Sequence, residues 1–597
     1  MKAIALPADV VLNIYRLKYY DGDADLLNLS YVCQIWRDAL HRFPDFWAKV
    51  DLHLGKRGPD QKAAYWVKRA GQKPLVIHVR CGGPQPVMSA RRLALIIVRI
   101  GLVLRGCMDR WDSFTIEAGP QEIEHLLPIC TGYAPRLRVL SLSDWTGSDV
   151  QRVLVPILPS AEPASGSSQL SVIVHNYIPR FTMFGLGITQ LSVDLDWPDE
   201  DSAFSLNDLF SIFQSCPNLI DFHLSAPGSD DMGPPSLSGV VFLPRLTTLS
   251  LSWVRNVGDV FSFLRLPLLE SIALHEAEWS DAARVGLWSV FESSPLLSSV
   301  VVQQDDDYHY EREPVPFHPN PLTLSNMSAF HMEGSQAFLQ PLLGFLTLPR
   351  VEKLGLAGAP ISSIHRLLSS SNGLRDLTLR SLRRVPAQPD SAPTPAQAPV
   401  ILPSLTSLEI TGFPAFVDHI HAPRLKTLKL ENHYNAVRIV DSGIFLRAAI
   451  EQSAFVLTTL CLNGLYVGDK DIQWCLERLP ALEELSISYC AISDAILSAL
   501  ALPPQALPEK NTSWLLPCLK RFAFEKNDHI TTSGALKFLA SRTLNPVPNI
   551  TGNFGFTLHL SREDAAAVLS YGSFLSSHHC MLYYLSLEGT SDDELLI

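Results

Sequence analysis

The sequence has 597 residues, of which 47% are hydrophobic and 18% are charged, and its formal net charge is −12 at pH 7. A chain of this length exceeds what one compact core requires, so we expect several domains or an elongated array of repeats, ordered rather than disordered. The negative charge argues against nucleic acid as the main partner, because phosphate binding requires clustered Lys and Arg.

The first fifty residues are predicted to form amphipathic helices. Pro7 stands in a first turn, and one helical face carries Val10, Val11, Ile14 and Leu17. A second helix is predicted from Asp25, as its N-cap, to Leu40, with apolar residues at helical spacing. A module of this size cannot hide those side chains within itself, so we expect them to form a partner surface.

The residue order in this segment resembles the F-box motif. It reads L-P-x-D-V-V-x-x-I at 6–14, D-L-L-x-L-S-x-V-C-x-x-W-R-D at 25–38 and F-W at 46–47, and it departs from the motif in a long polar connection at 19–24. The resemblance implies docking onto a Skp-type adaptor and, through it, onto a cullin. The adaptor-binding side chains expected are Leu6, Pro7, Val10, Ile14, Leu29, Val32, Cys33, Trp36, Leu40 and Trp47. The alternative is that these helices only cap the end of a repeat array.

Residues 51–109 are predicted to be a connecting helical or first-repeat region between the F-box, at 1–50, and the repeats. The most apolar run, 93–104, contains Arg99 and is too short to cross a bilayer, so it predicts a buried helix. Pro7 and Asp9 interrupt the apolar N-terminus, which argues against a secretory signal. We therefore expect no membrane partner.

From about residue 110 one pattern recurs: Leu, two residues, Leu, one residue, Leu, usually after a Pro. Its copies begin at Leu137, Leu219, Leu246, Leu269, Leu297, Met327, Val351, Leu374, Leu405, Leu425, Leu457, Leu482, Leu519 and Leu582. The last two apolar positions alternate with period two, which predicts a short strand with one buried face. Helical spacing follows at 206–213, 285–291, 445–450, 472–479 and 495–500.

One strand–turn–helix unit cannot bury both of its apolar faces, so neighbouring units must stack on a shared core. The pattern resembles the leucine-rich-repeat family. The fold class is therefore predicted to be α/β: a helical F-box followed by a leucine-rich-repeat horseshoe over 110–597, with parallel strands on the concave side and helices on the convex side. Residues 383–400 hold five prolines and no periodicity, which indicates an exposed insertion.

Residues interleaved with the strand leucines, or directly after them, are expected to face the concave surface. Aromatic and charged residues there are candidate anchors for a protein target. The alternative for each single residue is an ordinary solvent-exposed position with no partner. The predicted target-binding residues are Trp253, His275, Glu276, Glu333, Arg380, Glu409, Lys429, Glu431 and Tyr489.

No motif for nucleotide binding, serine hydrolysis or zinc proteolysis occurs in a supporting strand–helix context. The ten cysteines include no CxxC pair, so we predict no metal, cofactor or catalytic residue, and a cytoplasmic or nuclear location where thiols stay reduced. The sequence favours a non-enzymatic substrate-recognition subunit of an SCF-type ubiquitin ligase, whose target it does not identify. The alternative is a repeat scaffold that acts without ubiquitin transfer.

Overall fold

A computed structural model describes most of the chain, and its residues form two compact units, Met1–Leu296 and Leu297–Ile597. The described residues are Val10, Asn13, 33–56, 58–81, 89–144, 151–158, 169–181, 183–196, 204–227, 240–254, 257–277, 280–304, 319–381, 399–432, 442–501, 515–527, 529–543, 551–556 and 580–584. Most of the predicted first helix, and nearly all of the proline-rich insertion, lie outside them.

The first unit is built on a parallel sheet in which each strand pairs with the next repeat's strand. Its strands are β1 (Lys49–His53), β2 (Leu75–Arg80), β3 (Trp111–Glu117), β5 (Val139–Ser143), β8 (Leu170–His175), β10 (Ile188–Asp194), β11 (Asp221–Ser225), β13 (Thr248–Ser252) and β15 (Ser271–Ala277). Its helices are α3 (Gln34–Arg42), α4 (Pro59–Arg69), α5 (Ala90–Arg105), α6 (Pro120–Leu126), α7 (Leu206–Ser215), α8 (Val257–Phe263) and α9 (Asp281–Ser293), with 3-10 turns η1 (Pro44–Trp47), η2 (Met108–Arg110) and η3 (Met183–Gly187).

The second unit repeats the same construction. Its strands are β16 (Ser299–Gln304), β18 (Ala329–Glu333), β20 (Lys353–Ala357), β21 (Asp376–Arg380), β23 (Ser407–Thr411), β25 (Thr427–Glu431), β26 (Thr459–Asn463), β27 (Glu484–Ser488), β28 (Arg521–Glu525), β29 (Thr551–Phe556) and β30 (Cys580–Tyr584). Its helices are α10 (Gln336–Leu343), α11 (Ile361–Ser369), α12 (Ser442–Ser453), α13 (Asp469–Glu477), α14 (Asp494–Ala501) and α15 (Thr532–Thr543), with the 3-10 turn η5 (Pro414–His419).

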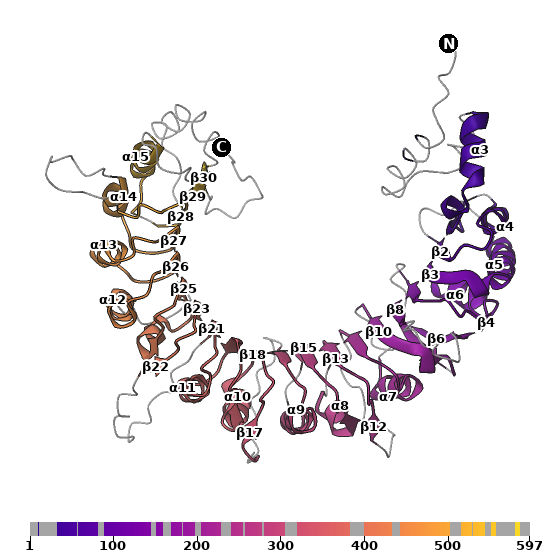
Figure 1. The fold of residues 1–597 in the computed structure, drawn as a ribbon, viewed down its shortest axis with the longest axis horizontal. Coiled ribbons are helices and arrows are strands. Elements are labelled where there is room, and N and C mark those ends of the chain that lie inside the picture. Colours follow the sequence, from indigo (N-terminus) through magenta and orange to yellow (C-terminus); the bar gives the residue numbers. More distant parts are fainter. Residues whose placement is uncertain are drawn as a thin grey trace, which may run out of the picture. The chain divides into compact units, whose positions relative to one another are not determined.

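Short parallel pairs replace or accompany a helix in some repeats. They are β4 (Gly132–Tyr133) with β7 (Ile157–Leu158), β6 (Gln151–Val155) with β9 (Tyr177–Phe181), β12 (Val241–Phe242) with β14 (Leu264–Arg265), β17 (Leu322–Thr323) with β19 (Leu346–Thr347), and β22 (Val400–Ile401) with β24 (Ile420–His421). Within each unit the long sheet runs along the inner edge and the helices along the outer edge (Figure 1).

The apolar residues of the repeat build the core between strands and helices. The strand register places Leu249 opposite Ile272 and Leu251 opposite Leu274, and all four side chains are buried. Residues between these positions point to the other side of the sheet, which we call the strand face. The predicted α/β leucine-rich-repeat fold is confirmed in the described residues of both units, and each predicted helical stretch overlaps one of the helices α7, α9, α12, α13 and α14.

In several repeats a proline before the strand belongs to a recurrent β-turn. The amide N–H of Leu269 donates to the carbonyl oxygen of Leu266 at 3.2 Å, and that of Leu425 donates to Ala422 at 3.1 Å. Pro267 and Pro423 stand at the second turn position, where the fixed φ of proline fits and its missing N–H leaves no donor unpaired. The turn therefore sets the first apolar residue of the repeat beneath the strand.

Repeat strands lie within 51–109, the segment predicted to be a connecting helical or first-repeat region. β1 pairs with β2 and β2 with β3, so the region 51–109 contains repeat strands in register with the rest. The same spacing is present at Trp47-Val50-Leu52 and at Trp111-Phe114-Ile116, with tryptophan in place of the first leucine. These two copies were not among the predicted repeats, because tryptophan stands at their first apolar position.

The predicted helix from Asp25 to Leu40 is not continuous. Cys33 has extended backbone angles, φ −161° and ψ 170°, and α3 begins at Gln34. The apolar spacing of the sequence runs through Cys33 without interruption, and such spacing alone does not mark the end of a helix.

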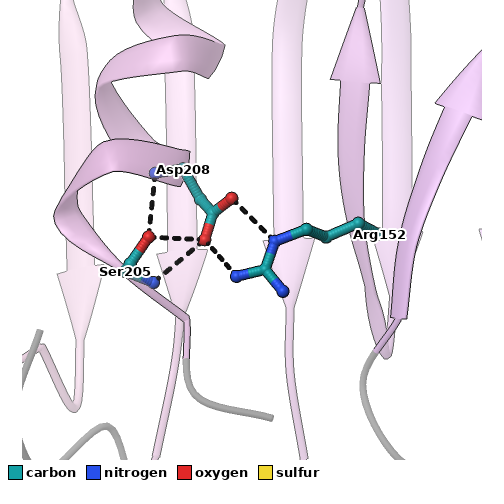
Figure 2. Close-up of polar contacts among 3 residues, drawn as sticks. All are labelled: Arg152, Ser205 and Asp208. Carbon is teal, nitrogen blue, oxygen red and sulfur yellow. Dashed lines mark hydrogen bonds and ion pairs between the residues drawn. The ribbon is translucent and has the colours of Figure 1, made fainter.

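One polar cluster fixes the start of α7 (Figure 2). Ser205 and Asp208 form a capping box, in which each side chain bonds the other residue's backbone N–H. Arg152 of β6 donates from Nε and Nη2 to the two carboxylate oxygens of Asp208, at 3.0 and 2.7 Å. Burial opposes ionisation of Asp208, but the hydrogen bonds from Arg152 and Ser205 outweigh it and lower the pKa of Asp208.

Candidate protein interface

The helix α3 is fastened to the first repeat by two fully buried side chains, Leu40 and Trp47. The Nε1–H of Trp47 donates to the carbonyl oxygen of Leu40 at 3.0 Å, and the indole meets the rings of Trp66 and Tyr65 edge-on at 5.0 and 5.5 Å. The prediction that Leu40 and Trp47 contact an adaptor is therefore corrected. Trp47 is the first apolar residue of the β1 repeat, and its burial holds α3 in place.

The opposite side of α3 carries exposed apolar groups. Ile35 and Phe43 are 46% and 41% exposed, and Trp36 and Cys33 are half-buried. Sequence reasoning missed Ile35, which lies off the apolar face formed by Trp36 and Leu40, and Phe43, which follows the end of α3. Of the other expected adaptor contacts, Val10 is helical and half-buried. Leu6, Pro7, Ile14, Leu29 and Val32 lie outside the described residues.

Three predicted target-binding residues occupy one recurrent position, two residues after the last apolar residue of the repeat pattern, which is Leu251, Leu274 or Ile487. There Trp253, Glu276 and Tyr489 have positive φ angles of 60°, 51° and 53°. Other repeats place glycine at this position, as at Gly358 and Gly464. A bulky residue with positive φ is uncommon and costs about 1–3 kcal/mol, and such residues cluster at functional sites.

A hydrogen bond to the next repeat holds this conformation. The amide of Trp253 donates to the carbonyl oxygen of His275 at 2.8 Å, and that of Tyr489 donates to Glu525 at 3.0 Å. Lys526, with φ 51°, places its ammonium 4.9 Å from the ring centroid of Tyr489. The end of the strand face in the second unit thus presents an aromatic ring with a cation over it.

The strand face of the second unit brings together four more predicted residues: Arg380, Glu409, Lys429 and Glu431. Arg380 Nη2 lies 3.0 Å from Glu409 Oε1, and Glu409 stands opposite Lys429 in the strand register. Glu431 accepts a hydrogen bond from Asn463 at 2.8 Å. Ion pairs this exposed add little to stability, so their charges remain available to a partner.

The remaining predicted residues are more dispersed. Glu333 lies on β18, 3.9 Å from His331, whereas His275 lies on β15 of the first unit beside Glu276. Trp253, His275 and Glu276 therefore belong to the first unit, and the other predicted target-binding residues belong to the second.

Sequence reasoning missed a titratable cluster on the strand face of β1, β2 and β3. Asp51 accepts a hydrogen bond from Arg80 at 3.0 Å, and His78 Nε2 lies 2.8 Å from Glu117 Oε1. Burial lowers the pKa of His53, whose ring lies 3.8 Å from Asp51. Arg80 Nε is buried with no hydrogen-bond partner, an arrangement that an added ligand or water often satisfies. The repeat spacing at Trp47 and Trp111 is the sequence signal that could have revealed this cluster, because it predicts the strands that carry these side chains.

The described residues contain no group of three or more His, Cys, Asp or Glu side chains placed to hold a metal ion. None of the helices seen in that part of the chain has the length and apolar content needed to span a membrane. Burial raises the pKa of Cys475 to about 12, as in a thiol that serves as a core side chain rather than a nucleophile.

No protein-family model matches the chain, and no curated protein matches it significantly in sequence. Among solved structures, the complex of Rad7 and Elc1 from yeast aligns with 11% identity and a TM-score of 0.29, covering 78% of this chain and 90% of that one. A leucine-rich-repeat protein of Leptospira interrogans aligns with 11% identity and a TM-score of 0.31, covering 78% and 92%. Likenesses this distant assign no function, and the repeat fold rests on the strand register.

Proposed function

We propose that this chain is the substrate-recognition subunit of an SCF-type ubiquitin ligase, with no catalytic residue of its own. In this role the N-terminal module binds a Skp-type adaptor, and through it a cullin, while the strand faces bind a protein target. The observation that supports the proposal is how α3 is held against the first repeat. Leu40 and Trp47 fix α3 to the first repeat, whereas Ile35 on the helix and Phe43 directly after it remain exposed.

A rigid joint between α3 and the repeats suits this role. A ligase subunit accelerates ubiquitin transfer by holding its target near the conjugating enzyme, so the target surface must keep a fixed position relative to the adaptor. The rings of α4 hold Trp47 in place, and its hydrogen bond to Leu40 ties α3 to the β1 repeat. Fastening the adaptor-binding helix to the repeat core through buried side chains provides that constraint.

Target recognition is assigned to the polar and aromatic groups of the strand faces. Arg380, Glu409, Lys429 and Glu431 offer charges of both signs on neighbouring strands, and Tyr489 offers an aromatic ring beside them in the same unit. Interfaces of this kind obtain selectivity from charge arrangement and affinity from a few aromatic anchors. The partner expected is therefore a protein segment with alternating charges rather than a small ligand.

Co-purification of the full chain with a Skp-type adaptor tests the proposal. Val32→Ala combined with Trp36→Ala should weaken adaptor binding by more than about 2 kcal/mol if these residues are interface anchors. Gln34→Ala is the matched control, because Gln34 is exposed on the same helix and should leave binding unchanged. Adaptor binding that survives the double substitution would refute the F-box assignment.

The runner-up is a repeat scaffold in which the N-terminal helices cap the solenoid. The complete burial of Leu40 and Trp47 favours it, since a cap must cover the apolar end of the first repeat. Under this alternative, purification recovers target proteins without adaptor or cullin, and target abundance does not change when the chain is depleted. Under the ligase proposal, depletion makes the target accumulate.

A further inference from the structure

The outer face of α5 combines exposed apolar side chains with arginines. Leu95, Val98 and Leu102 are 56%, 38% and 58% exposed, whereas Ile97, Ile100 and Leu104 on the opposite side are buried. The helix reads ARRLALIIVRIGLVLR and contains four arginines and no acidic residue. An ordinary surface helix turns a polar face to water, so this face is unusual for one.

The exposed residues follow the spacing of a coiled-coil seam. Leu95, Val98 and Leu102 are separated by three and four residues, which are the a, d and a positions of a heptad. Arg91 and Arg105 occupy the d positions at either end, and both are exposed. The seam is therefore a short apolar strip, about one heptad long, with an arginine at each end.

The two flanks of the seam differ. Arg92 and Arg99 stand at e positions and are exposed, and Arg99 forms only a long, exposed ion pair with Asp60, at 3.5 Å. On the g side, a Cβ at Gly101 would lie 2.8 Å from Ile129 Cγ2, so that side is covered by the chain itself. A partner helix packed along the seam would therefore contact Arg92 and Arg99 on the flank that the chain itself leaves uncovered.

We propose that α5 docks an amphipathic helix of a partner protein, with leucine-like residues at i, i+3 and i+7 and with Asp or Glu along its flanks. Charge complementarity selects the acidic helix, because its carboxylates would face Arg92 and Arg99. An anionic membrane fits less well. The strip has no aromatic residue of the kind that interfacial helices insert, and the exposed Glu124 lies on the adjoining helix α6. This inference does not depend on the proposed ligase role.

Fluorescence anisotropy of the full chain tests it with two labelled peptides of about three heptads. Both have leucine at a and d, one with glutamate and the other with lysine at e and g. Like charges keep each peptide from pairing with itself. The glutamate peptide should bind the chain and the lysine peptide should not. Leu95→Ser with Leu102→Ser should weaken binding about tenfold or more, while Val285→Ser, an equally exposed apolar residue on α9, should not.

A charge-reversal variant distinguishes specific docking from nonspecific binding. Arg92→Glu with Arg99→Glu should invert the preference, so that the lysine peptide binds better than the glutamate peptide. An unchanged preference, or no binding of either peptide to a folded chain, overturns the proposal. Two other results also overturn it: phosphatidylserine vesicles that bind through Leu95 and Leu102 while the peptide does not, or concentration-dependent dimerisation lost in the same variant.

Discussion

Trp47 and Leu40 meet across the junction between the N-terminal helix and the first repeat, where the indole Nε1–H of Trp47 donates to the Leu40 carbonyl oxygen at 3.0 Å. Leu40 ends the buried side of α3, and Trp47 occupies the first apolar position of the β1 repeat. One contact therefore joins the predicted adaptor-binding module to the solenoid, and the position of α3 depends on the integrity of that repeat.

Replacing Trp47 should release α3. Trp47→Ala removes a large buried side chain and its hydrogen bond, with an expected cost of about 3–5 kcal/mol, whereas Trp47→Phe retains most of the ring contacts and should cost less. Hydrogen exchange of the full chain measures this, through faster exchange in residues 33–56. Trp36→Ala is the control on the same segment. If it accelerates exchange as much as Trp47→Ala does, Trp47 is not the fastening point.

Gly464 should tolerate no side chain. Its φ is 63°, and a Cβ would lie 2.6 Å from the carbonyl oxygen of Asn432 in the preceding repeat. Gly464→Ala therefore combines backbone strain with a clash and should lower the free energy of unfolding of this region by about 1–3 kcal/mol. Gly373→Ala serves as control, since its nearest atom would lie at 3.8 Å. Equal chemical-denaturation midpoints for the two variants would contradict the expectation.

The sequence predicted some parts of the repeat better than others. The strand leucines, such as Leu249 and Leu251, were visible because period-two burial leaves a direct trace in the sequence. The β1 and β3 repeats were missed because tryptophan replaces leucine at Trp47 and Trp111, and with them the Asp51–Arg80 cluster was lost. The left-handed backbone conformation of Trp253 could not be predicted from the sequence either. Its cause is a hydrogen bond to the next repeat, which overrides local propensity.

The charges of Arg380 and Glu409 should matter for target capture more than for stability. Glu409→Lys with Glu431→Lys is expected to abolish capture in affinity purification, since it inverts two charges of the strand face, while adaptor binding remains. Arg380→Glu with Glu409→Arg keeps the ion pair but exchanges its signs, so stability should be retained within about 1 kcal/mol. Capture that survives this exchange would show that the partner does not recognise the pair.

Acid should weaken the start of α7 through Asp208. The pKa of Asp208 is lowered in the folded chain, so its ionised form stabilises the fold. This stabilisation is complete above the unfolded pKa of about 4 and is lost as the pH falls through the lower folded value. Asp208→Asn should cost about 1–2 kcal/mol at neutral pH, because a buried charged acceptor and part of the cap are removed.

The pH dependence distinguishes this ion pair from a simple loss of packing. The difference in unfolding free energy between the native chain and Asp208→Asn should shrink below about pH 4, where the native carboxyl becomes protonated too. Arg152→Met removes the cation that lowers the pKa of Asp208, so its acid transition should move to higher pH than in the native chain. Thermal unfolding followed across this range measures both shifts. A difference that stays constant with pH would mean that Asp208 contributes by shape and not by charge.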